Sequence, residues 1–108
     1  MATLTLTGLS GSKYDFEIYS KDTTFNAVGG VYAITNRYKK SDGNFTHNLI
    51  YIGQTNDLSE RFDNHHRIAC FNRNNWNSIC VHRDDSDTSR FAKEKDLIDG
   101  NNPTCNRD

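Results

Sequence analysis

The sequence predicts an α/β domain of the α+β class: a small mixed or antiparallel three-stranded core sheet flanked by helices, with an added N-terminal β-hairpin. Three observations predict it: two alternating runs near the N-terminus, three runs rich in strand formers, and two stretches with apolar residues at helical spacing. The length of 108 residues suits one domain. We therefore expect a single domain over 1–108, with residues 1–28 as the hairpin extension and 29–106 as the core.

The hairpin is predicted from strict alternation of polar and apolar residues over 3–7 and 14–19. A turn rich in glycine and serine, residues 8–12, separates the two runs. Alternation with a period of two places one set of side chains on one sheet face. Two such runs around a Gly/Ser turn are typical of a β-hairpin.

Three further strands are predicted. Residues 30–36 and 48–53 are rich in valine, isoleucine and tyrosine, and a turn cluster at 40–44 lies between them. They should pair antiparallel across this loop. Residues 78–82 alternate again, with Ile79 and Val81 inward.

A first helix is predicted over about 58–70. Asp57 and Glu60 have the spacing of a capping pair at its start. Arg61 and His65 are four residues apart, so on a helix they share one face. A fixed cation beside a titratable ring suits an anionic ligand, although two solvated side chains would show the same spacing.

A second helix should begin in the acidic cluster 84–87 and end at Gly100. Glu94 falls on or beside its apolar stripe. A carboxylate there is costly unless it is paired or binds a metal, and Arg90 at i−4 is the alternative partner. The stripe consists of Phe91, Leu97 and Ile98.

Composition limits the compartment and the partners. The formal net charge is −1, but residues 37–83 carry seven Lys/Arg against four Asp/Glu, a local excess of basic residues where a phosphate backbone could bind. Cys70, Cys80 and Cys105 form no tight pair, so we expect small semi-buried thiols in a reducing compartment. No apolar run approaches the roughly 20 residues of a membrane span, and no secretory signal is visible. The expectation is therefore a cytoplasmic protein, nucleoid-associated in a bacterium.

Tyr32 and Tyr51 lie on the two strongest strands, where buried tyrosines are usually core residues. Their surroundings are more specific: Gly30-Val31-Tyr32 on one strand and Tyr51-Ile52-Gly53 on the next. An arginine and a histidine follow at 61 and 65, then a glutamate at 94 and an asparagine at 106. This ordered pattern, over about residues 29–106, resembles the GIY-YIG nuclease family. Val31 in place of the usual isoleucine is a conservative departure.

The resemblance implies roles for these positions. Tyr32 and Tyr51 resemble the two active-site tyrosines, and Arg61 the arginine that contacts phosphate. His65 is similar to a histidine found in a large subset of the family. Glu94 resembles the metal-binding carboxylate, and Asn106 the asparagine that ends the motif. Gly53 is expected to permit a close approach of backbone or substrate.

A site of this kind would hydrolyse DNA phosphodiester bonds with one divalent ion, Mg²⁺ or alternatively Mn²⁺, held by Glu94. Either Tyr32 or His65 could be the general base. The substrate is expected to be DNA, including branched or damaged DNA, bound with the help of a second copy of the chain or a separate DNA-binding partner. The alternative function is a non-catalytic nucleic-acid-binding or assembly module that keeps the nuclease fold. Expected DNA-contacting residues are Arg37, Lys39, Lys40, Arg61, His66 and Arg67.

Overall fold

The structure, a computed structural model, describes residues 2–60 and 62–107. Its centre is a five-stranded sheet in the order β1-β2-β5-β3-β4, in which every pair of neighbours is antiparallel. The predicted α/β class is confirmed, but the sheet is larger than the predicted three strands because the hairpin joins it through β2 and β5. The strands are β1 (Thr3–Thr7), β2 (Lys13–Ser20), β3 (Gly30–Lys39), β4 (Phe45–Thr55) and β5 (Ser78–Arg83).

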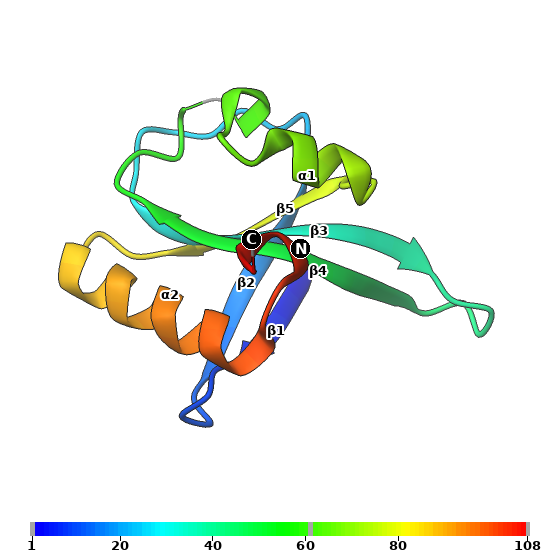
Figure 1. The fold of residues 1–108 in the computed structure, drawn as a ribbon, viewed down its shortest axis with the longest axis horizontal. Helices are drawn as coiled ribbons and strands as arrows, with labels where there is room; N and C mark the ends of the chain where they lie inside the picture. Colours follow the sequence, from blue (N-terminus) through cyan, green and yellow to red (C-terminus); the bar gives the residue numbers. More distant parts are fainter. Residues whose placement is uncertain (1, 61, 108) are drawn as a thin grey trace.

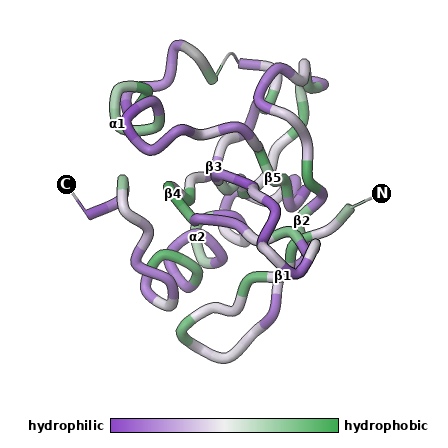
Figure 2. The backbone as a smooth tube through the Cα atoms, turned by 90° about the vertical axis from the view of Figure 1, so that its right-hand side faces the viewer, coloured by the Kyte–Doolittle hydropathy of each residue, from purple (hydrophilic) through white to green (hydrophobic). Residues whose placement is uncertain are grey.

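Helices cover both faces of the sheet. Helix α1 (Ile68–Arg73) lies on one side and α2 (Asp87–Asn101) on the other (Figure 1), and the view turned by 90° keeps this order (Figure 2). Because side chains alternate along a strand, β3 contributes to two cores. Tyr32 and Ile34 pack in the core on the α1 side, while Val31 and Ala33 pack with Leu97 on the α2 side.

The predicted helix over 58–70 is wrong for most of its length. A short 3₁₀ turn, η1 (Phe62–Asn64), precedes α1, which begins only at Ile68. Asp57 does not cap a helix, because its carboxylate accepts hydrogen bonds from the backbone N–H and hydroxyl of Ser59 and closes a local turn.

The second helix is confirmed and begins within the predicted cluster 84–87, but its C-terminal end and one face differ from the prediction. Ser86 is its N-cap and accepts a hydrogen bond from the Ser89 backbone N–H. The helix runs past Gly100, and Asn102 in the left-handed conformation follows it. Phe91 is 58% exposed, so its predicted place on the buried stripe is wrong. None of the helices within the described ranges is long and apolar enough to cross a membrane.

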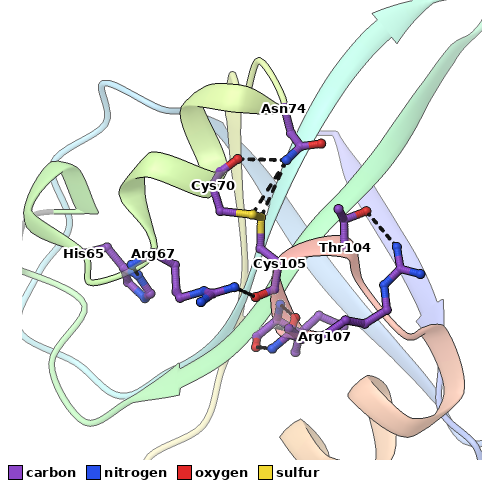
Figure 3. The surroundings of a disulfide bond; sticks show 9 residues. His65, Arg67, Cys70, Asn74, Thr104, Cys105 and Arg107 are labelled. Carbon is purple, nitrogen blue, oxygen red and sulfur yellow. Dashed lines mark hydrogen bonds between the residues drawn. A yellow bond between two sulfur atoms is a disulfide. The ribbon is translucent and has the colours of Figure 1, made fainter.

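The cysteines also differ from the expectation of three thiols. Cys70 of α1 and Cys105 of the C-terminal 3₁₀ turn η2 (Thr104–Asn106) form a disulfide (Figure 3). A sequence separation of 35 residues hid this pairing, and folding brings the two Cα atoms to 6.0 Å. Cys80 is a free thiol, as expected, but it is fully buried and not semi-buried.

Candidate active site

The two tyrosines lie together on the α1 side of the sheet, with ring centroids 6.1 Å apart. Tyr32 is opposite Gly53 in the β3–β4 register, and Tyr51 is two residues before Gly53 on β4. A Cβ atom at Gly53 would lie 2.5 Å from Tyr32 Oη and 2.9 Å from the Tyr51 ring. Glycine at this position therefore makes room for both rings.

Tyr32 and His65 are directly joined. Tyr32 Oη lies 2.7 Å from His65 Nε2, and the other ring nitrogen, Nδ1, accepts a hydrogen bond from the Arg67 backbone N–H at 3.0 Å. Burial lowers the pKa of His65 to about 4, with His66 and Arg67 acting in the same direction. His65 is therefore neutral near pH 7. With Nδ1 as acceptor, its single proton resides on Nε2 and points at Tyr32.

Tyr32 itself is 5% exposed. Burial, followed by the charges of Tyr51, Glu94 and Glu60, raises its pKa well above the ordinary value of a tyrosine. Burial and Glu94 also raise the pKa of Tyr51. Both phenols are neutral at pH 7 unless a positive charge binds beside them.

Glu94 lies on α2, on the other side of the sheet, and its charge raises the pKa values of both tyrosines. It is half-buried, and burial raises the pKa of its carboxyl, partly offset by the Gln54 backbone N–H. The alternative partner, Arg90, is bound elsewhere: it pairs with Asp87. No ion pair of Glu94 is present in the part of the chain that the structure describes.

Arg90 has a structural role next to the site. It is 2% exposed, donates from Nε to Gln54 Oε1 at 3.1 Å, and donates from Nη1 to the Asp84 carbonyl oxygen at 3.0 Å. These bonds fix the first turn of α2 against the end of β4. Glu94 lies one turn further along the same helix, so the hydrogen bonds of Arg90 help to fix the position of the Glu94 carboxylate.

Asn106 closes the open edge of the sheet. β4 is an edge strand, and Asn106 accepts a hydrogen bond from the Ile52 N–H at 2.8 Å and donates one to the Ile52 carbonyl at 2.9 Å. This pair of bonds imitates a neighbouring strand between Tyr51 and Gly53. Asn106 therefore positions the β4 backbone between Tyr51 and Gly53.

A cleft of about 650 Å³ opens in front of Tyr32 and His65. Gln54 and Glu60 also line it, beyond the residues that the sequence predicts for the site. The place of Gln54 directly after Gly53 is a signal that could identify it, whereas the spacing of Glu60 from Asp57 predicts a helix cap. Within residues 2–60 and 62–107, no three His, Cys, Asp or Glu side chains cluster into a metal cage made of protein ligands alone.

The expected DNA-contacting residues fall into two groups. His66 stacks on His65, with ring centroids 4.4 Å apart, and Arg67 donates from Nη2 to the Cys105 carbonyl oxygen at 2.6 Å, so both lie at the site (Figure 3 shows Arg67). Arg61, the expected phosphate-contacting arginine, lies outside the described residues. The shared helix face predicted for positions 61 and 65 is wrong, because His65 lies between η1 and α1. The second group is on the β3–β4 hairpin: Arg37, Lys39 and Lys40.

Comparisons with known proteins support the motif. Residues 28–107 match the family described as the GIY-YIG catalytic domain. No significant match was found among the curated proteins or among the solved structures. The matched range contains both tyrosine strands, the cleft and the C-terminal turn. Because the match extends over most of the sequence, the chain belongs to the GIY-YIG catalytic domain family, a family of nucleases.

Proposed function

We propose that the protein is an endonuclease that hydrolyses DNA phosphodiester bonds with one divalent ion, Mg²⁺ or Mn²⁺. The observation that carries the proposal is the hydrogen bond between Tyr32 Oη and His65 Nε2 at the floor of the cleft. This bond joins the Tyr32 oxygen, which can accept a proton once it is ionised, to the His65 ring, which orients that oxygen. Glu94, from a different element, adds its charge beside the same pair.

The residues present fit a magnesium ion bound through Glu94. Mg²⁺ binds in proteins through one or two carboxylates and keeps several waters. Glu94 is a half-buried carboxylate whose ion pairing is absent among the described residues, the situation in which a bound cation would offset its desolvation. When bound, the ion would act as a Lewis acid on the phosphate and stabilise the leaving oxygen.

The tautomer of His65 favours Tyr32 as the general base. With Nδ1 accepting from the Arg67 backbone, the ring donates from Nε2 to Tyr32 Oη. A donor to the tyrosine oxygen stabilises the phenolate, and a cation bound at Glu94 would lower the pKa of Tyr32 further. Tyr32 would first release its own phenolic proton to solvent, and the phenolate would then take a proton from an attacking water while His65 holds the oxygen in place. His65 has no free lone pair facing the water in this arrangement, because one nitrogen accepts and the other donates.

Cations around the cleft would contact the phosphate. Arg61 is the proposed principal contact, by the resemblance of its position in the motif. Arg67 lies close enough to affect the pKa values of both Tyr51 and His65, so it adds positive charge beside the reacting group. His66 lines the same cleft.

The proposed substrate is DNA, including branched or damaged DNA. The disulfide between Cys70 and Cys105 argues against the reducing compartment that the sequence predicts. With a net charge of −1, one domain should make few phosphate contacts and bind with modest, salt-sensitive affinity. A second copy of the chain or a separate DNA-binding partner would add the missing contacts.

A nicking assay tests the proposal. Supercoiled and branched DNA are incubated with the protein in Mg²⁺, in Mn²⁺ or in EDTA, beside Glu94→Gln. We expect nicking only with a divalent ion, and a loss of at least ~100-fold in Glu94→Gln, which keeps the size of the side chain. DNA binding without cleavage in both metals would instead establish the non-catalytic alternative. Equal nicking in EDTA would also contradict the metal assignment.

A further inference from the structure

The hairpin formed by residues 36–48, here called the arm, extends beyond the rest of the sheet (Figure 1). β3 pairs with β5 only from Gly30 to Thr35, but with β4 from Gly30 to Lys39. The arm is therefore a two-stranded ribbon, and no third strand lies beside it within residues 2–60 and 62–107. Such a ribbon has little stability of its own in water.

The base of the arm is nevertheless fixed. Asn77 donates from Nδ2 to the Arg37 carbonyl at 2.9 Å and accepts from the Arg37 N–H at 2.8 Å, so one amide side chain replaces the missing strand. Asn36 donates from Nδ2 to the Asn75 carbonyl oxygen. The asparagine-rich loop after α1 thus holds the ribbon at a set angle to the sheet that carries Tyr32.

The surface of the arm is basic and aromatic. The arm contains three basic residues and one acidic residue, although the net charge of the whole chain is −1. The basic residues are Arg37, Lys39 and Lys40, and the acidic residue is Asp42. Lys40 and Asp42 form an exposed pair at 3.9 Å, which is worth little in water. The two aromatic rings of the arm strands are exposed to solvent: Tyr38 is 45% and Phe45 is 55% exposed.

One face of the arm is organised for an anionic partner. Arg37 is opposite His47 and Lys39 is opposite Phe45, so these four side chains share a face. The Arg37 guanidinium lies over the Phe45 ring at 4.3 Å, which reduces its freedom before any partner binds. Tyr38 points to the opposite face.

From these observations we infer that the arm enters the major groove of duplex DNA about six base pairs from the scissile phosphate, an inference that rests on the proposed DNA substrate. The major groove is about 12 Å wide and admits a two-stranded β-ribbon. Six residues separate Tyr51 from Phe45, a span of about 20 Å in a strand. At roughly 3.4 Å per base pair, the arm contacts the duplex about six base pairs from the cut.

The test compares charge-matched variants. The double variant Lys39→Gln, Lys40→Gln is set beside Lys13→Gln, Lys95→Gln, which removes two positive charges elsewhere on the surface. Binding to a linear duplex is measured in EDTA, where the proposed cleavage is absent, at several salt concentrations. We expect the slope of log Kd against log salt to fall by about 1 to 2 in the arm variant only, since each phosphate contact contributes about 0.9.

The groove is identified by methylation protection. Dimethyl sulfate attacks guanine N7 in the major groove, so the wild-type protein should protect guanines about six base pairs from the nick, and the arm variant should not. Equal salt slopes in the two double variants, or protection only of minor-groove adenine N3, would overturn the inference. Binding by the arm without nicking in Mg²⁺ would refute the nuclease proposal alone, and nicking with equal slopes would refute the arm alone.

Discussion

The disulfide between Cys70 and Cys105 should contribute a large share of the stability of this small domain. A cross-link lowers the entropy of the unfolded chain, by about 2.1 + 1.5R ln n cal/mol/K for a loop of n residues. For the 35-residue separation this amounts to about 4 kcal/mol at 25 °C. In a domain of this size, that corresponds to a fall in Tm of roughly 15 °C on reduction.

The assay is thermal unfolding followed by circular dichroism, with and without a phosphine reductant. The double variant Cys70→Ala, Cys105→Ala should unfold at the Tm of the reduced wild-type protein, both with and without reductant. Cys80→Ala is the matched control: Cys80 is buried and unpaired, so its variant should keep the response to reductant. Identical Tm values for the oxidised and reduced wild-type protein would refute the reasoning.

The bond should also affect the site. Cys105 precedes Asn106, whose side chain binds both backbone groups of Ile52, and Arg67 donates to the Cys105 carbonyl oxygen. Reduction should therefore increase hydrogen exchange of the Ile52 amide before the sheet as a whole opens. Nicking should decline in reductant at temperatures where the fold persists.

Three further predictions concern the cleft. Gly53→Ala should cost about 1–3 kcal/mol in urea unfolding and slow nicking at least ~10-fold, because its methyl group would meet Tyr32 Oη; an unchanged rate would contradict this packing. His65→Gln should make the free energy of unfolding less sensitive to acid. Folding lowers the His65 pKa from 6.5 to about 4, so the unfolded chain binds more protons than the folded chain between these pH values, and the wild-type protein loses stability on acidification. The variant lacks the ring and should not show this loss. Equal losses of unfolding free energy in the wild type and the variant between pH 7 and pH 5 would contradict this prediction. Glu94→Gln should leave stability at pH 7 unchanged or higher while abolishing cleavage, since burial raises the Glu94 pKa and disfavours its charged form; a clear loss of stability would show that Glu94 has a structural partner instead.

Local patterns were sufficient to predict the strands and the second helix. β3, β4 and β5 combine strand-forming residues with turn residues at their ends, so sequence periodicity indicates them directly. The prediction of the first helix is wrong because Asp57, which has the spacing of a helix cap, closes a turn with Ser59 instead. Phe91 has helical spacing with Leu97 but lies on the exposed side, a distinction that depends on how α2 is rotated against the sheet.

The site could be predicted as a set of residues but not as an arrangement. Order along the chain pointed to Tyr32, Tyr51, His65 and Glu94, yet nothing in the spacing indicated that His65 bonds Tyr32 while Glu94 comes from the other face of the sheet. The disulfide was hidden for the same reason, because a contact across 35 residues has no local signal. Such features depend on tertiary packing.

The most direct test of the central claim is single-turnover nicking by Tyr32→Phe in Mg²⁺. The ring still fills its place in the core, so the fold should be unchanged, and only the oxygen that accepts the proton is removed. The cleavage rate should fall by at least ~100-fold, the usual contribution of a general base, with DNA binding unchanged. Cleavage by Tyr32→Phe at the wild-type rate would contradict it.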